Sequence, residues 1–100
     1  MPAISRKGDS LSTGHICVGT TTLGGTNTDN TVWASGAEVA VIGAPTVSHA
    51  FPPDPPCTPH IASLNDGSPN VFVNGIGVGR IDDSADAGAM TSGSGTVIVN

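Results

Sequence analysis

Residues 67–75 have the sequence GSPNVFVNG, in which a Gly-Ser turn leads into alternating valines and then into an Asn-Gly turn. Short alternating runs of β-branched residues are typical of β-strands, and Asn-Gly is a strong hairpin signal. Similar stretches occur at residues 35–43, SGAEVAVIG, and at residues 93–100, GSGTVIVN. We therefore expect an all-β fold of short hairpins with pseudo-threefold repeats, although a chain rich in Gly, Ser and Val also looks self-similar through composition alone.

A further repeat appears when the chain is shifted by 74 positions, so that residues 6–19 fall on residues 80–93. Five of the fourteen aligned positions are then identical, and all five hold polar or turn-forming residues: Arg6 and Arg80, Asp9 and Asp83, Ser10 and Ser84, Gly14 and Gly88, Gly19 and Gly93. Identities of these residue types are typical of repeated turns, so the shift indicates that the two segments have related structures.

The two ends of the chain complete one copy of the hairpin repeat between them. The last copy stops at Asn100, whereas the middle copy continues through residues 75–80, GIGVGR. Residues 1–6, MPAISR, resemble that missing continuation. We therefore predict that the two termini lie side by side and close a ring of repeats.

The composition excludes several classes of protein. Lys and Arg number 3 against 8 Asp and Glu, which gives a net charge of −5 and no basic face for nucleic acid. The longest apolar run, residues 39–42, is far shorter than the roughly 20 residues that cross a bilayer. Residues 1–7 lack the apolar region of a secretory signal, so we expect synthesis in the cytoplasm without a signal peptide.

A chain of 100 residues has room for one small domain. We expect a single domain over residues 1–100, with no appended effector domain. Gly or Pro interrupts almost every window of about ten residues, which argues against long helices. The best short helical candidate is residues 83–90, although two Asp and one Gly weaken it.

The N-terminal residues 2–9, PAISRKGD, resemble the Pro-Ala-Ala-Arg-x-Gly-Asp signature of the PAAR-repeat family. Residues 67–75 are similar to the hairpin that precedes that signature in each repeat. The resemblance covers nearly the whole chain except residues 23–30. It is incomplete, because the other two copies have PTVS at residues 45–48 and GVGR at residues 77–80, so only one copy keeps both Pro-Ala and Arg.

Membership of this family implies a structural role. Its members are small β cones on the blunt end of a trimeric β-helical spike in type VI secretion systems and contractile phage tails, with a zinc ion near the apex. The resemblance therefore implies a zinc-binding tip that caps and sharpens the spike for membrane piercing. Its partner would be a trimeric spike protein (VgrG-like or the phage central spike), and the target membrane would be contacted transiently.

The same resemblance implies a location at the tip of a phage virion tail or of a type VI apparatus, and no small-molecule substrate. The low content of charged side chains also fits a surface covered by another protein. We expect the spike-binding base at the strand ends and turns after Gly43, Gly75 and Asn100.

A metal site is predicted at His15, His49, Cys57 and His60, which include every histidine of the chain. Zinc binds this mixture of imidazole and thiolate in a tetrahedral arrangement, and the two-residue spacing between Cys57 and His60 suits a tight turn. Four protein ligands leave no open position for water, so we expect a structural zinc and no enzyme. His15 falls on Ala89 in the shifted comparison, so we expect one zinc ion per chain.

Two other functions remain open from the sequence. A small zinc hydrolase would hold its ion through His15, His49 and His60 and keep a water in the fourth place. A β module that binds a partner without metal is the other. The hydrolase is disfavoured because the sequence has neither a His-Glu-x-x-His helix nor a Gly-x-Ser-x-Gly elbow.

The sequence also leaves details of the site open. Cys17 is interpreted as a core residue, but it replaces Cys57 as the fourth ligand in one alternative and pairs with Cys57 in a disulfide in another. Iron or nickel also suits a mixed His and Cys site. Arg6 and Arg80 either clamp carboxylates of a partner or pair with acidic residues of the chain itself.

Overall fold

The computed structural model describes residues 2–15, 18–28, 32–51 and 58–99. These residues form an all-β structure of short antiparallel hairpins, which confirms the predicted fold class. The strands are β1 (Ser10–Ser12), β2 (Thr20–Thr22), β3 (Trp33–Ala34), β4 (Ala37–Glu38), β5 (His49–Phe51), β6 (Thr58–His60), β7 (Phe72–Val73), β8 (Ile76–Gly77), β9 (Ser84–Ala85) and β10 (Gly88–Ala89). Each pairs with its neighbour in the chain. The described residues contain no helix, and hence none that could cross a membrane.

The helical candidate at residues 83–90 is wrong. These residues form the β9–β10 hairpin, in which Ala85 pairs with Gly88 and Ser84 with Ala89. Asp86 begins the two-residue turn with a φ of 54°. Asp is one of the few residues that enter this left-handed region readily, so the residue that weakened the helix also makes the turn.

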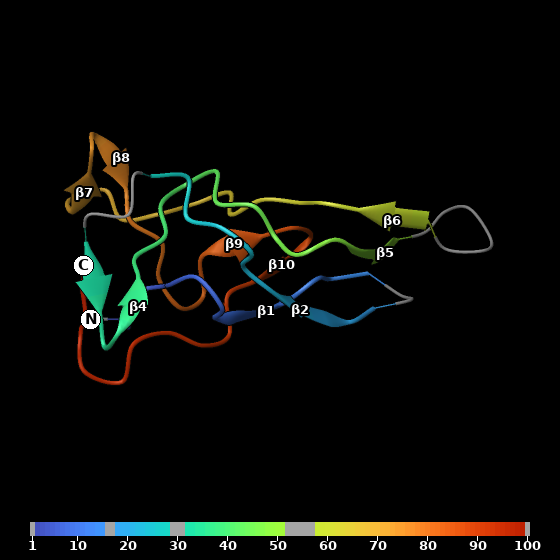
Figure 1. The fold of residues 1–100 in the computed structure, drawn as a ribbon, viewed down its shortest axis with the longest axis horizontal. Helices are drawn as coiled ribbons and strands as arrows, with labels where there is room; N and C mark the ends of the chain where they lie inside the picture. The colour runs from blue at the N-terminus through green and yellow to red at the C-terminus, as the bar shows by residue number, and fades with distance from the viewer. Residues whose placement is uncertain (1, 16–17, 29–31, 52–57, 100) are drawn as a thin grey trace.

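The molecule is elongated, with extents of 40 × 24 × 23 Å. The β5–β6 hairpin lies toward one end of the long axis (Figure 1). The β3–β4 and β7–β8 hairpins and both chain ends lie at the opposite end, which we call the terminal end (Figure 1). The other two hairpins lie between these ends.

The two termini pair with each other, as predicted. Ala3 and Ile98 form an antiparallel bridge, and the Val99 N–H donates to the Pro2 carbonyl at 2.9 Å. The Ile4 N–H donates to the Val97 carbonyl at 3.0 Å. The first and last residues of the described chain are therefore held together by backbone hydrogen bonds.

A closed ring of backbone hydrogen bonds joins three distant segments in the interior. The Ser5 N–H donates to the Gly79 carbonyl at 2.8 Å, the Gly79 N–H to Ala40 at 2.9 Å, and the Ala40 N–H back to Ser5 at 3.0 Å. All three residues are buried. A Cβ at Gly79 would overlap the end of the Leu64 side chain, so a larger residue here would force that buried side chain to shift.

Three antiparallel bridges surround this ring in matching positions. They join Ile4 to Arg80, Arg6 to Val39, and Val41 to Val78. Each bridge links the residue before one ring member to the residue after another. Segments far apart in the sequence are thus held at one cross-section of the molecule.

The copy of the hairpin motif assigned to residues 35–43 is out of register. Ser35 and Gly36 have φ values of 52° and 80°, and Asn74 and Gly75 have 53° and 81°. Both pairs therefore form the same turn, between β3 and β4 and between β7 and β8. Residues 32–36, and not 35–43, correspond to residues 71–75. The sequence pattern placed Ser35–Gly36 in a turn ahead of the valines at residues 39–41, whereas the structure places this pair in the turn between β3 and β4.

The two segments aligned by the shift of 74 make the same ion pair. Arg6 donates from Nε and Nη2 to the two carboxylate oxygens of Asp9, at 3.0 and 2.9 Å. Arg80 meets Asp83 in the same way, at 2.9 and 2.8 Å. Both guanidinium groups therefore pair within the chain, which decides between the two alternatives for them.

The apolar side chains form two buried clusters. The first consists of Leu11, Leu23, Ala40, Ala44, Leu64, Ala85 and Met90. The second consists of Ile4, Ala34, Val39, Val41, Val73 and Val78. The second includes residues of β3 and β7 and so lies toward the terminal end, whereas the first takes residues from β1 and β9.

Candidate metal centre

Three histidines and one aspartate converge from three parts of the fold. His49 and His60 face each other as the first residue of β5 and the last residue of β6. His15 follows β1, and Asp86 lies in the turn between β9 and β10. Their ligand atoms lie close enough together to hold a metal ion, and this is the one such group among the described residues.

The four ligand atoms stand at the corners of a nearly regular tetrahedron. The three His Nε2 atoms are separated by 2.9, 3.3 and 3.3 Å. Asp86 Oδ2 lies 2.8 Å from Nε2 of His49, 3.0 Å from that of His15 and 3.4 Å from that of His60. Ligands about 2.0–2.2 Å from a tetrahedral zinc ion lie about 3.3–3.6 Å from one another, so the observed group is slightly contracted from that geometry.

The hydrogen bonds of His49 fix which ring nitrogen faces the cluster. Nδ1 lies 2.8 Å from the Val47 carbonyl, an acceptor, so Nδ1 must carry a proton. In the neutral ring, Nε2 then presents a lone pair to the other three groups. Hydrogen bonding of the other ring nitrogen to a carbonyl is the usual way of orienting a histidine ligand.

The four converging ligand atoms are poorly matched as hydrogen-bond partners, and a bound cation would remove that mismatch. Three imidazole nitrogens and a carboxylate oxygen meet in one small volume, and each neutral Nε2 that accepts has no proton to offer its neighbours. Protonating the rings would instead bring positive charges within 3.3 Å of one another. A central divalent ion converts all four lone pairs into bonds, so the residues fit a metal.

The cluster is largely withdrawn from water. The side chains of His49, His15 and Asp86 are 3–7% exposed, and that of His60 is 25% exposed. Burial raises the pKa of Asp86, but hydrogen bonds and charge from His49, His15 and His60 outweigh it, so its pKa lies below the ordinary value. Asp86 is therefore an ionised carboxylate at neutral pH, the form that binds metal.

Close backbone packing brings His15 and Asp86 together. A Cβ at Gly14 would overlap the carbonyl of Ala87, and one at Gly88 would overlap the carbonyl of Ser12. The Ala87 N–H donates to the Thr13 carbonyl at 2.9 Å across the same contact. These two glycines, which the shift of 74 aligns, let the β9–β10 turn lie against the segment that carries His15.

The structure unites three of the four predicted ligands. His15, His49 and His60 meet as expected, while Cys57 and Cys17 lie outside the described residues. Asp86 was missed, because carboxylates are common and its segment was interpreted as a weak helix. The turn-forming residues Ser84, Asp86 and Gly88 lie close together in the sequence, and this cluster is the turn signal that would have drawn attention to Asp86.

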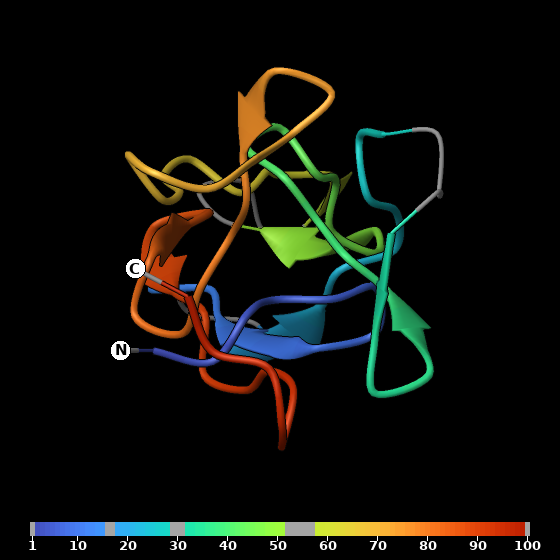
Figure 2. The ribbon, with the colours of Figure 1, turned by 90° about the vertical axis from the view of Figure 1, so that its left-hand side faces the viewer.

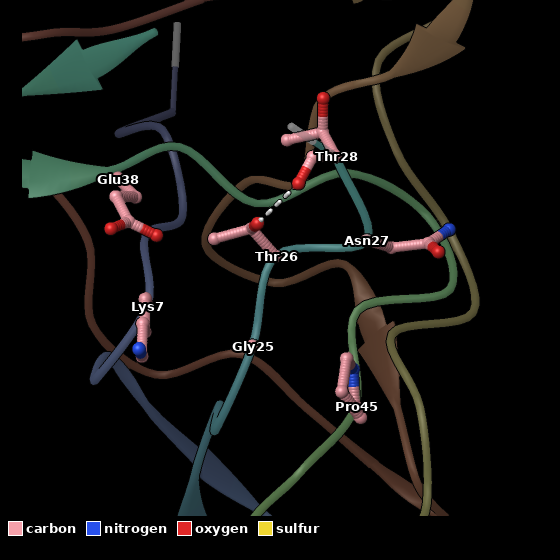
Figure 3. A pocket seen from close by; sticks show the side chains of 7 residues that line it. All are labelled: Lys7, Gly25, Thr26, Asn27, Thr28, Glu38 and Pro45. Atoms are coloured by element: carbon pink, nitrogen blue, oxygen red, sulfur yellow. Dashed lines mark hydrogen bonds between the residues drawn. The ribbon is translucent and has the colours of Figure 1, made fainter. Parts of the chain in front are cut away.

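A separate open hollow of about 350 Å³ shares no residue with the metal cluster (Figure 3). Its lining consists of Lys7, Gly25, Thr26, Asn27, Thr28, Glu38 and Pro45. The two charged side chains, Lys7 and Glu38, have opposite signs, and both come from the same side of the hollow (Figure 3). It offers no set of like ligands, so the chemistry of the described residues centres on the metal cluster.

Comparison with protein-family models and with curated proteins returned no match to this chain.

Proposed function

We propose that the protein is a structural tip that one metal ion stiffens, resembling the PAAR-repeat family, and that it caps a trimeric β-helical spike of a contractile injection machine. The observation that carries this proposal is the buried tetrahedron of His15, His49, His60 and Asp86. A single ion there would tie three segments together in a chain that has neither Phe nor Trp among its described buried residues. Such a cross-link suits a small mechanical part.

The resident ion of this proposal is zinc. Three imidazoles and a carboxylate match its preferred donors and its tetrahedral geometry. Four protein donors occupy the place that a reactive water would need, which supports a structural ion over a hydrolytic one. Zinc would then act by holding the chain in shape, and no substrate is required.

The proposed pseudo-threefold architecture draws support from the ring of Ser5, Ala40 and Gly79 and from its three matching bridges. Viewed from the terminal end, β3–β4, β7–β8 and the C-terminal segment project in three directions around the centre (Figure 2). A cone would have its broad base at this end and its apex toward β5–β6. A base with three similar segments suits the end of a trimer, because each segment can meet one chain.

Three exposed apolar side chains are proposed to anchor the partner. Trp33, Phe72 and Ile98 are 59%, 55% and 53% exposed. They hold corresponding positions, each one residue after Val32, Val71 or Val97. The carbonyls of these valines accept from Val39, Val78 and Ile4 at 3.0 Å. Ser35–Gly36 thus takes the place at this base that was expected for Gly43.

The experiment is native mass spectrometry of the protein mixed with a trimeric β-helical spike protein. We expect one chain per spike trimer. Trp33→Ser and Phe72→Ser should each weaken the complex about tenfold or more, as for central anchors. Val47→Ser and Ile61→Ser are matched controls, since these exposed apolar residues adjoin the β5–β6 hairpin and should leave affinity unchanged. A lack of binding, or sensitivity to the control variants alone, would contradict the proposal.

A further inference from the structure

One side of the hollow in Figure 3 is formed where two charged residues meet across neighbouring segments. The Lys7 N–H donates to the Glu38 carbonyl at 2.8 Å. The fold makes this backbone bond three times, each time from two residues after one member of the interior ring to two residues before another. The other two bonds, at 3.0 Å each, run from Ile42 to Gly77 and from Ile81 to Ala3. The charged pair therefore stands where the other copies have an isoleucine and a small residue.

The hollow also borders a segment that is longer than its counterparts. Gly25, Thr26, Asn27 and Thr28 line the hollow, and they belong to a segment two residues longer than the two that match it. The starts of the three segments correspond, because each first N–H donates to the carbonyl five residues after a ring member. Their ends correspond as well, because each last carbonyl accepts from the N–H one residue before a ring member. The segments run from Gly24 to Val32, from Asn65 to Val71 and from Thr91 to Val97.

Hydrogen bonds to neighbouring segments hold the longer segment in place. Asn27 has a φ of 59°, and its Nδ2 donates to the Ile42 carbonyl at 2.8 Å. Thr28 Oγ1 accepts from Asn74 Nδ2 at 2.6 Å. The Thr26 carbonyl accepts from the Val41 N–H at 3.0 Å. The hollow is thus formed before any ligand arrives, which lowers the entropic cost of binding.

Several polar groups around the hollow are not used by the fold. Among the described residues, neither the Lys7 ammonium nor the Glu38 carboxylate forms an ion pair, although both arise from the same side of the hollow. The Gly25 N–H and C=O likewise make no hydrogen bond within the described part of the chain. A glycine in an extended segment lets another backbone approach closely. These groups together suit a ligand that carries both charges and has a backbone of its own.

We propose that this hollow binds an extended peptide segment of a second protein, one segment per chain, through the Gly25 backbone and the charges of Lys7 and Glu38. The segment would carry an acidic and a basic residue two positions apart, because alternate side chains of a strand share one face about 6.6 Å apart. Neighbouring segments such as those of Lys7 and Glu38 lie about 4.8 Å apart, so the two spacings are compatible.

This inference does not rest on the proposed function. The hollow shares no residue with the apolar set of Trp33, Phe72 and Ile98, and its lining is mainly polar. Its volume of about 350 Å³ has room for a few residues of peptide. Charges of both signs at one site disfavour nucleic acid, which needs a basic surface. A free amino acid also carries both charges but offers no peptide backbone to Gly25.

The test is an NMR titration of the ¹⁵N-labelled protein with acetylated and amidated tetrapeptides. The probes are Glu-Ser-Lys-Ser, the reversed charge order Lys-Ser-Glu-Ser, and the neutral Gln-Ser-Gln-Ser. We expect saturable amide shifts at Lys7, Gly25 and Glu38, with one charge order preferred. The neutral peptide should bind at least about threefold more weakly, because exposed ion pairs contribute modestly. N-methylation of the peptide amides should abolish the shifts, because it removes the donors that would pair with Gly25.

The matched variants test the charges directly. Lys7→Glu combined with Glu38→Lys keeps the net charge and should reverse the preference between the two charge orders. Asp82→Asn is the control, since Asp82 is exposed and does not line the hollow, and it should leave both affinities unchanged.

Three results would overturn the proposal: no saturable shift with either charged peptide, an unreversed preference in the folded double variant, or equal binding of the N-methylated peptide. Equal binding of free glutamate or lysine would also overturn it, in favour of a small zwitterion. The peptide titrations use the wild-type chain and so do not depend on the folding of a variant. Because binding to a spike trimer is measured separately, loss of peptide binding alone would leave the proposed function standing.

Discussion

His49 and His60 face each other across the β5–β6 hairpin with their Nε2 atoms 2.9 Å apart. The Nδ1–H of His49 donates to the Val47 carbonyl, so in the neutral ring Nε2 carries the lone pair. His15 Nε2 and Asp86 Oδ2 also lie within 3.3 Å of this atom. A cation bound at the centre of this cluster would therefore stabilise the folded state, because it would bind atoms that otherwise crowd one another.

Removal of the metal should lower the melting temperature strongly. An ion present at a hundred times its Kd stabilises the folded state by about 2.7 kcal/mol. For a domain of this size, 1 kcal/mol moves the melting temperature by about 4–8 °C. We expect a fall of about 10 °C or more on chelation, measured by differential scanning calorimetry, and recovery on adding Zn²⁺. A melting temperature that chelation leaves unchanged would favour the metal-free binding module.

The cost of losing His49 should depend on the metal. In the metal-bound protein, His49→Ala removes the most buried ligand and should abolish most of the stabilisation by the ion. In chelated protein the same change also relieves the crowding of Nε2 atoms, so the loss of stability should be smaller. Urea unfolding of both proteins in both conditions measures this difference. Equal losses with and without metal would indicate that His49 acts as an ordinary packing residue.

Ser5→Ala should stabilise the protein by about 1 kcal/mol, because a buried hydroxyl without a partner costs free energy. Ser5 is fully buried, and its Oγ has no hydrogen-bond partner among the residues that the structure describes. Ser94→Ala is the matched control, since Ser94 is also buried but its Oγ accepts from the Thr96 and Val97 N–H groups. Urea denaturation should show opposite signs for the two variants, and destabilisation by both would argue against the prediction.

Gly14→Ala should destabilise the fold by at least about 2 kcal/mol and weaken metal binding, because Ala is strained at positive φ and overpacking costs more. Gly14 has a φ of 74°, and its Cβ would overlap the Ala87 carbonyl beside Asp86. Gly19→Ala is the control, since nothing lies within 4 Å of its Cβ position. Thermal melts with zinc titration measure both effects. Similar behaviour of the two variants would contradict the close packing of these segments.

Arg6→Lys and Arg80→Lys should each destabilise the protein by about 1–3 kcal/mol, because lysine cannot reproduce the two-point pairing with a carboxylate. Arg6→Lys should have the larger effect. Arg6 also donates to the carbonyls of Ala34, Ser35 and Gly93, whereas within the described part of the chain Arg80 donates to one further carbonyl, that of Gly67. Unfolding of both variants in guanidinium chloride at matched ionic strength measures which substitution lowers the free energy of unfolding more. The reverse order would show that these backbone contacts contribute little.

Local patterns predicted much of the fold. Asn74–Gly75 indicated a hairpin that the structure contains, because this pair enters positive φ at little cost. The pairing of the termini followed from matching the chain start to the residues after Gly75. The register of the first copy was lost because Ser35 makes the same turn without the usual Asn.

Part of the candidate site was also predictable, but from the type and number of residues and not from a local pattern. His15, His49 and His60 are the only histidines of the chain, and imidazole is uncommon enough for their number alone to suggest a ligand set. Asp86 is one of many carboxylates, and only the tertiary packing of Gly14 and Gly88 brings it to the histidines. No local pattern carries that information.

The most direct test of the metal site is the metal content of the protein by native mass spectrometry, after purification without a histidine-rich tag. The account predicts one zinc ion per folded chain, retained under mild chelation and lost in His49→Ala. A folded wild-type chain that carries no metal after exposure to Zn²⁺ would contradict it.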